Sequence, residues 1–185
     1  MKGKIIINSD DIKSGMITMG FREVSVYPNS GVMWENNGGT IIFNGNCMIG
    51  NASFLSFGKN TQVEFGKDFR NTAALRLVSY HGIKFGDYAR LGWESVIMDT
   101  NFHPIYDMER KKFRKAGGPI TIGDYNWFGT GCKIMHSVNT PERCIFGMGT
   151  IVTRNCEMKS YCVMGGSPVK ILSENVMRDY EHDTE

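Results

Sequence analysis

The chain has 185 residues, the length of a single domain that can bury a substantial core. Its composition is 41% hydrophobic with 22 glycines and 5 prolines, which is globular, and its net charge of +2 favours no nucleic acid or other polyanionic partner. No apolar stretch approaches the length of a membrane span, and the one near the N-terminus is too short for a signal peptide, so we expect a cytoplasmic protein.

Residues 1–40 show short extended patterns separated by polar and glycine-bearing turns. The two clearest patterns are residues 4–7 and 23–27. We expect irregular first coils or an N-terminal cap here, within one domain that covers residues 1–185.

Residues 41–97 carry a period of six, which fits neither a helix nor a simple two-residue alternation and therefore indicates a repeat architecture. The large apolar positions are Phe43, Ile49, Leu55, Phe85, Leu91 and Ile97. Small residues stand four places later at Cys47, Ser53, Ala89 and Ser95. The phase is lost around residues 57–66, which predicts a widened or skipped corner, and residues 71–80 read as a further irregular coil.

Residues 98–118 interrupt the repeat, which restarts out of phase at Ile120. A long excursion from a rigid scaffold is a common place for functional residues, and this one contains His103 followed by Pro104. It also contains a basic run at residues 110–115, which could attract an anionic ligand, although such runs are more often solvated loops.

Residues 119–172 hold the period of six in one phase. The apolar ladder is Ile122, Phe128, Ile134, Phe146, Val152, Met158 and Met164, with Thr140 as the exception. The ladder four places later is Asn126, Cys132, Val138, Cys144, Thr150, Cys156 and Cys162. This pattern predicts a parallel β-helix of triangular cross-section, with one hexad on each side and the large residue of each hexad pointing inward. Residues 173–185 form a polar tail, which we expect to be a short helix or a frayed end.

The cysteines belong to this scaffold. All five occupy the small-residue position of a hexad and none forms a Cys-x-x-Cys pair, so we interpret them as free core fillers and expect no metal.

Three segments resemble the C-terminal coils of the hexapeptide-repeat acyltransferases. They are residues 120–131 (ITIGDYNWFGTG), 146–155 (FGMGTIVTRN) and 165–172 (GGSPVKIL). The resemblance is strongest to galactoside, maltose and capsular-polysaccharide O-acetyltransferases and covers roughly residues 40–172. It implies an all-β, left-handed β-helix, contrary to the usual right-handed crossover. It also implies a homotrimer with active sites between adjacent subunits and acetyl-CoA as cosubstrate.

The activity implied is transfer of an acetyl group to a saccharide hydroxyl, with the acceptor, O- or N-acetylation and acyl length left open. Residues 99–104 resemble the segment that carries the family's general base, which assigns that role to His103. An imidazole can take the proton of a hydroxyl as it attacks a thioester, with no covalent enzyme intermediate. Asp99, which we also place at the acceptor site, is a candidate to orient the His103 ring, with Asp107, a backbone carbonyl or a neighbouring subunit as alternatives.

Other site residues follow from the same resemblance. Trp127 matches a tryptophan beside the acceptor and thioester and should point outward because it precedes the rung Phe128, and Asn71 matches an acceptor-site asparagine. The family positions that hold the pantetheine arm of CoA correspond to Gly129, Thr130, Gly147, Met148, Thr153 and Arg154. The basic residue near the adenosine phosphate corresponds to Lys170.

Two alternatives stay open. His81 and His136 suit structural or supporting roles, and His182 lies in the tail, but His81, His103 and His136 could nominally bind zinc as in carbonic-anhydrase-like β-helices. The other alternative is a β-helix that only binds or supports a partner.

Overall fold

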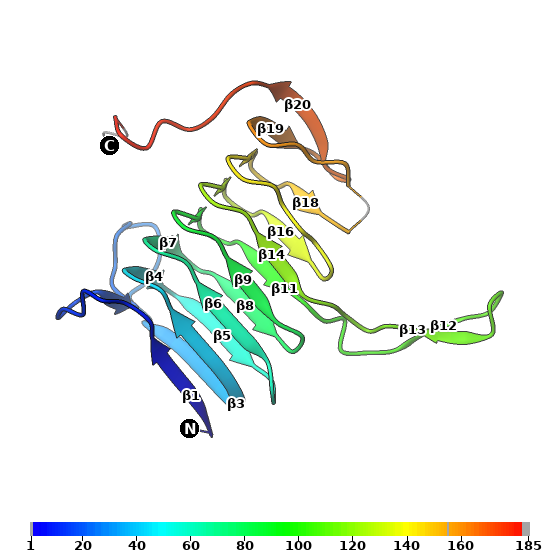
Figure 1. The fold of residues 1–185 in the computed structure, drawn as a ribbon, viewed down its shortest axis with the longest axis horizontal. Helices are drawn as coiled ribbons and strands as arrows, with labels where there is room; N and C mark the ends of the chain where they lie inside the picture. The colour runs from blue at the N-terminus through cyan, green and yellow to red at the C-terminus, as the bar shows by residue number, and fades with distance from the viewer. Residues whose placement is uncertain (1, 155, 183–185) are drawn as a thin grey trace.

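The computed structural model describes residues 2–154 and 156–182, and within them it contains twenty short strands and no helix (Figure 1). Successive strands coil around one axis into a three-sided prism, and each side is a mainly parallel sheet built from successive coils. The all-β, left-handed parallel β-helix expected from the repeat and the resemblance is confirmed.

The three faces are numbered in the order in which the chain visits them. The first face contains β1 (Lys2–Ile7), the end of β3 (Val32–Phe43), β6 (Gln62–Phe65), β9 (Ile83–Phe85) and β14 (Ile120–Ile122). The second face contains β2 (Ile17–Met19), β4 (Cys47–Asn51), β7 (Phe69–Ala73), β10 (Arg90–Leu91), β15 (Trp127–Phe128), β17 (Ile145–Phe146), β19 (Cys162–Gly165) and β20 (Lys170–Glu174). The third face contains the start of β3, β5 (Ser53–Phe57), β8 (Arg76–Ser79), β11 (Val96–Met98), β16 (Lys133–Met135) and β18 (Ile151–Val152).

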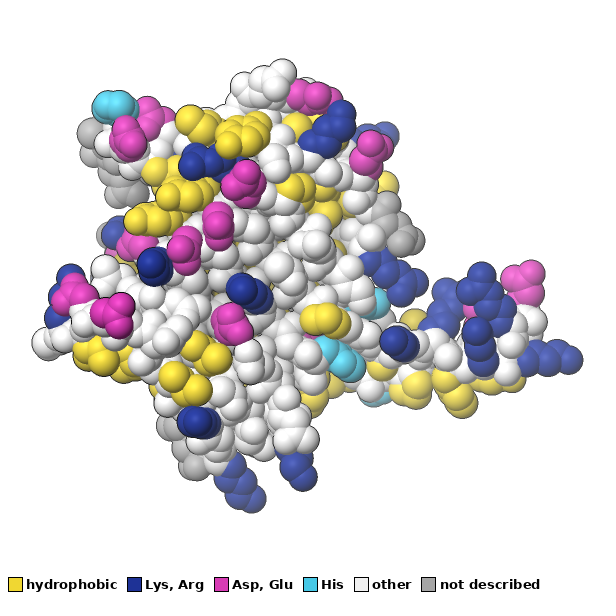
Figure 2. All heavy atoms as spheres, in the orientation of Figure 1, with side chains coloured by type: hydrophobic (Ala, Val, Ile, Leu, Met, Phe, Trp, Pro, Cys, Tyr) yellow, Lys and Arg dark blue, Asp and Glu magenta, His cyan; other side chains and the backbone are white. Residues whose placement is uncertain are grey.

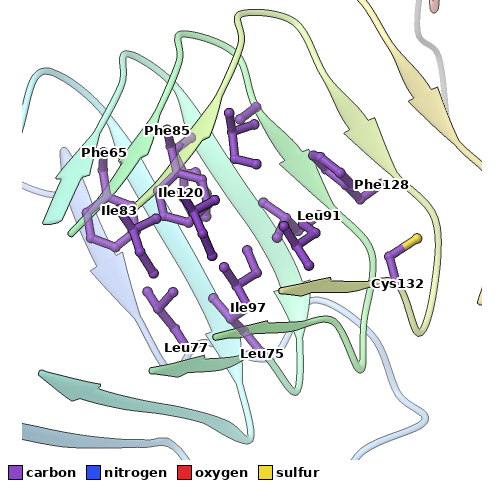
Figure 3. Close-up of a cluster of buried hydrophobic side chains, with 14 of the residues drawn as sticks. Phe65, Leu75, Leu77, Ile83, Phe85, Leu91, Ile97, Ile120, Phe128 and Cys132 are labelled. Carbon is purple, nitrogen blue, oxygen red and sulfur yellow. The ribbon is translucent and has the colours of Figure 1, made fainter. Parts of the chain in front are cut away.

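The large residues of the hexads form the core between these faces. Every large position from Phe43 to Val152 listed in the sequence analysis is at most 2% exposed, and Figure 3 shows several of these side chains pointing into the prism. Because partner strands are in register, like residues stack from coil to coil: the ring centroids of Phe43 and Phe65 are 5.2 Å apart, and those of Phe128 and Phe146 are 4.4 Å apart. Burial of such apolar ladders is the main favourable contribution to folding.

The exception Thr140 has a partner inside the prism. Its Oγ1 accepts hydrogen bonds from Asn126 Nδ2 at 2.7 Å and from Gly123 N at 3.1 Å. The Asn126 side-chain oxygen in turn accepts from Cys144 N at 2.7 Å. The two buried polar side chains therefore hydrogen-bond to each other and to the backbone, which offsets the cost of removing them from water.

The N-terminal coils are more regular than the sequence suggested. β3 crosses a corner, pairing with β5 through residues 32–36 and with β6 through residues 40–43, so regular pairing starts before residue 41. Residues 71–80, expected to be irregular, lie largely in β7 and β8 and pair in parallel with their neighbours. The phase break at residues 57–66 is a widened corner between β5 and β6, and no corner is skipped.

The C-terminal part is less regular after β18. Met158 and Cys156 are only partly buried, and the described residues between β18 and β19 contain no strand. All five cysteines are free, and four are buried. Burial raises the pKa of Cys132 to about 11 and that of Cys144 to about 12, so these thiols are unreactive core fillers, as expected.

Candidate functional site

The excursion leaves the prism at the corner where the chain passes from the third face to the first. Its two limbs, residues 99–101 and 116–118, form an antiparallel neck: Asn101 N donates to Ala116 O at 2.6 Å and Gly118 N to Asp99 O at 3.0 Å. Beyond the neck, residues 102–115 form an arm that projects from the body and contains the hairpin β12 (Ile105–Asp107) and β13 (Lys112–Arg114) (Figure 1). The sequence located the excursion but gave no sign of the hairpin.

Asp99 anchors this corner from below. Its carboxylate is fully buried and accepts from Ser79 Oγ at 2.8 Å and from three consecutive backbone N–H groups, those of Tyr80, His81 and Gly82, at 2.7 to 2.8 Å. These donors fix the turn on which the neck rests. Neither oxygen faces solvent, and no hydrogen bond to His103 is present among the described residues.

His103 lies just beyond the neck and is exposed. Its backbone N–H donates to Asn101 O at 2.6 Å, and the preceding Phe102 is held by Thr100 Oγ1, which accepts from Phe102 N at 3.0 Å. The Phe102 ring packs edge-on against Tyr80, with centroids 5.1 Å apart. The backbone at His103 is therefore held by hydrogen bonds while its side chain is exposed.

The arm is braced at its tip by Asp107. This carboxylate accepts from Arg110 N at 2.9 Å and from Arg114 Nε and Nη2 at 3.1 and 2.9 Å. The Arg110 N–H and then the Arg114 guanidinium hold the pKa of Asp107 below its usual range. Asp107 thus supports the hairpin, and its hydrogen bonds go to Arg110 and Arg114 rather than to His103.

Two further histidines lie at the foot of the excursion. His136 Nε2 is 3.1 Å from Asn101 Nδ2, and His136 Nδ1 is 3.2 Å from Ser137 Oγ. A Cβ atom placed on Gly117 would come within 2.5 Å of the His81 ring, so the returning limb passes directly over that ring. Burial, followed by the charges of Arg154 and His81, lowers the pKa of His136. In one chain the described residues contain no group of three or more His, Cys, Asp or Glu side chains placed to hold a metal ion.

Trp127 lies elsewhere, on the outside of the second face, and is 36% exposed, so its expected outward orientation is confirmed. A groove of about 990 Å³ runs beside it. The groove is lined by Arg22, Glu23, Met48, Asp68, Arg70, Thr72, Tyr88, Arg90, Leu91, Gly92, Trp127, Arg178 and Tyr180. A single chain therefore does not bring Trp127 and His103 together, because His103 stands outside the corner between the other two faces.

The C-terminal tail covers one side of this groove. The Arg178 guanidinium lies 4.7 Å from the centre of the Trp127 ring, and Tyr180 Oη donates to Tyr125 O at 3.1 Å. Val176 N donates to Tyr161 O at 2.9 Å. The expected helix or frayed end is therefore wrong for residues 173–182, which continue β20 and then pack on the prism; residues 183–185 lie outside the described residues. The aromatic and arginine residues of the tail were the feature of the sequence from which this packing could have been predicted.

Asn71, expected at the acceptor site, points into the prism. It is fully buried, and its side chain donates to Ala73 O and Leu91 O, both at 3.3 Å, and accepts from Ser53 Oγ at 3.3 Å. In this position the side chain has no exposed surface to offer an acceptor.

The residues expected to bind CoA fall on separate parts of the prism. Gly129, Thr130, Gly147 and Met148 lie on successive coils at the corner between the second and third faces, with Met148 80% exposed. Thr153 and Arg154 follow β18, on the side where His136 lies, and Lys170 is exposed at the start of β20.

The sequence is similar to those of known acetyltransferases. It is 27% identical over 126 residues to the galactoside O-acetyltransferase of Escherichia coli, covering 68% of this chain and 60% of that protein. It is 25% identical over 140 residues to the galactoside O-acetyltransferase of Lactococcus lactis, covering 74% and 66%. The chain thus spans less than two thirds of either relative. No family model matches it.

Solved structures share the fold. The structure of the polySia-specific acetyltransferase NeuO matches with a TM-score of 0.64 at 19% identity, covering 100% of this chain and 88% of the other. The structure of a galactoside acetyltransferase in complex with coenzyme A matches with a TM-score of 0.53 at 23% identity, covering 78% and 64%. Within the described residues, no helix is long and apolar enough to span a membrane.

Proposed function

Because the chain is a homologue of the hexapeptide-repeat O-acetyltransferases and has their left-handed β-helix, we propose that it transfers an acetyl group from acetyl-CoA to a saccharide hydroxyl. The observation that carries the proposal is the placement of His103: an exposed imidazole at the base of an arm whose neck is hydrogen-bonded to a rigid coil. Relatives that act on galactosides and on polysialic acid support a sugar acceptor.

The proposed reaction is direct. His103 accepts the proton of the acceptor hydroxyl while that oxygen attacks the thioester carbonyl, the C–S bond breaks, and the proton passes to the departing CoA sulfur. Backbone N–H groups at the coil edge stabilise the developing oxyanion, a contribution of about 3–4 kcal/mol for one donor in other enzymes. In this proposal neither Asp99 nor Asn71 contacts the acceptor, because both side chains are buried and hydrogen-bonded within the coils.

Acetyl-CoA is assigned to the coil edge at Gly129, Thr130, Gly147 and Met148, with Thr153, Arg154 and Lys170 as further contacts. A solved galactoside acetyltransferase contains coenzyme A, which supports this cosubstrate. The edge is open at Gly147, where a Cβ atom would meet its nearest neighbour only at 3.6 Å, and tighter at Gly129, where a Cβ atom would lie 2.9 Å from Met148 N. The exposed cations Arg154 and Lys170 suit the phosphates of CoA.

The proposed assembly is a homotrimer in which the site forms between subunits. Two features support it: His103 and Trp127 lie on different parts of one chain, and the arm carries exposed apolar side chains. These are Phe102, Ile105, Tyr106, Met108 and Phe113, which are 45 to 80% exposed. In Figure 2 hydrophobic side chains line one edge of the arm and basic side chains gather at its far end. Such a surface is typical of a contact with another subunit.

The proposal is tested by CoA release from acetyl-CoA with a panel of mono- and disaccharide acceptors. Replacing His103 by alanine should lower acceptor-dependent release by about 100-fold or more, since a general base typically contributes that much. His182→Ala, which changes an exposed histidine of the tail, is the matched control and should retain the wild-type rate. Absence of turnover with every acceptor would reject the activity, and undiminished turnover in His103→Ala would reject the assigned base.

A further inference from the structure

One side-chain contact ties the excursion to the coil that follows it. Asn101 Nδ2 lies 3.1 Å from His136 Nε2, although the two residues are 35 positions apart in sequence. The main-chain oxygen of the same Asn101 accepts the backbone N–H of His103 at 2.6 Å. Asn101 therefore links the backbone of His103 to the next coil of the prism.

The chemistry of this contact sets the proton on His136. An amide nitrogen donates and does not accept, so Nε2 of the imidazole must be the acceptor and carry no proton. In the neutral ring the proton then sits on Nδ1, which donates to Ser137 Oγ at 3.2 Å. A protonated ring would direct an N–H group at the Asn101 NH₂ group and lose the contact.

The surroundings of His136 favour its neutral form. Partial burial disfavours a positive charge on the ring, and so do the charges of Arg154, which follows β18, and of His81, which precedes β9. Asp99 acts in the opposite sense, but its carboxylate is already bonded to Ser79 and to the turn at residues 80–82. The pKa of His136 is accordingly lowered, and the ring is neutral at pH 7.

We propose that His136 is a positioning residue for acetyl transfer: its neutral imidazole holds the Asn101 amide, which fixes the first limb of the neck and the direction in which His103 is presented. The inference rests on the proposed function of His103. His136 itself touches no reacting atom in this scheme. A displacement of the base by about 1 Å can cost about 100-fold in rate, so a contact of this kind matters.

The first test separates the hydrogen bond from the charge. His136→Leu removes the acceptor and should lower kcat about tenfold or more, with the KM for acetyl-CoA changed by less than about twofold. His136→Gln places an amide oxygen near the position of Nε2 and should restore kcat to within about threefold of the wild type. His182→Leu is the control for loss of a histidine away from the corner. Wild-type kcat in His136→Leu would overturn the proposal.

The second test uses coupling and pH. Asn101→Leu should lower kcat as much as His136→Leu, and the double variant should lose little more, because both changes break one contact. His136→Gln should lose one of the ionisations that lower the wild-type rate at acid pH, because glutamine does not titrate. If the losses of kcat in the double variant are additive, or if the rate of His136→Gln falls at acid pH as the wild-type rate does, the proposal is contradicted.

A third measurement needs no activity. Nitrogen chemical shifts of ¹⁵N-labelled histidine should show the His136 ring at pH 7 with its proton on Nδ1 and not on Nε2. The opposite tautomer overturns the proposal even if the enzyme is active. If the wild type transfers no acetyl group but the Nδ1 proton is found, the proposed function fails while the contact between Asn101 and His136 stands.

Discussion

At the scale of single residues, the most heavily bonded side chain of the corner is Asp99. Replacing it by alanine leaves Ser79 Oγ and three backbone N–H groups without their buried acceptor. We expect the free energy of unfolding to fall by about 3 kcal/mol, because each orphaned buried donor costs about 1–3 kcal/mol and water replaces part of the loss. Denaturant unfolding of the variant measures the change.

A matched control for Asp99 exists at another corner. Asp124 accepts one backbone N–H, that of Asp87, at 2.8 Å, and its side chain is exposed. Asp124→Ala should therefore cost about 1 kcal/mol or less. Equal losses in the free energy of unfolding would show that the four hydrogen bonds of the buried Asp99 stabilise the protein no more than the single one of the exposed Asp124.

At the scale of elements, the arm depends on the brace at Asp107. Its pKa is lowered, so its bonds to Arg110 and Arg114 are present above the ordinary carboxyl pKa and are lost as the pH falls through the lowered value. Asp107→Asn should loosen the hairpin at neutral pH and speed tryptic cleavage at residues 110–112, about severalfold, because mobile loop tips are cut preferentially.

The charge-matched control for the brace is Glu109→Gln. It removes one negative charge from the same exposed turn and leaves the bonds of Asp107 in place. Its cleavage rate should remain that of the wild type. If trypsin cleaves the wild type, Asp107→Asn and Glu109→Gln at the same rate, Asp107 does not stabilise the hairpin.

At the scale of the whole molecule, the proposed trimer gives a direct prediction. Light scattering after size exclusion should show three chains per particle for the wild type. Ile105→Asp places a charge on the apolar edge of the arm, so it should shift the protein toward smaller species and reduce acetyl transfer with it. Ile12→Asp, at another exposed isoleucine, should leave the mass unchanged. A monomeric wild type would contradict the arrangement.

The repeat was predictable from the sequence because one rule repeats with each hexad. Every coil places its large residue in the same core, so Phe128 and Phe146 stack in the structure as their spacing predicts. The N-terminal coils were harder to predict, because the extra residues sit in corners such as 58–61 and shift the phase without disturbing the strand pairs.

The site was predictable only in part. The exposed position of His103 on the excursion and the outward orientation of Trp127 follow from local position, whereas the hydrogen bonds of Asn101, Asp99 and Asn71 depend on which coils become neighbours. Asn71 illustrates the difference, since its sequence context suggested a ligand contact and its position in the ladder turned the side chain inward. Contacts between coils are long-range, and a single sequence carries no local mark of them.

The reversal of the chain at β20 has a consequence for polymerisation. A parallel β-helix is a ladder with two open ends, and the backbone groups of a terminal coil can template the strands of another molecule. Here β20 runs antiparallel to β19, so a second prism arriving at this end meets, on the second face, a strand of the wrong direction. Growth of end-to-end fibres is therefore opposed at that terminus.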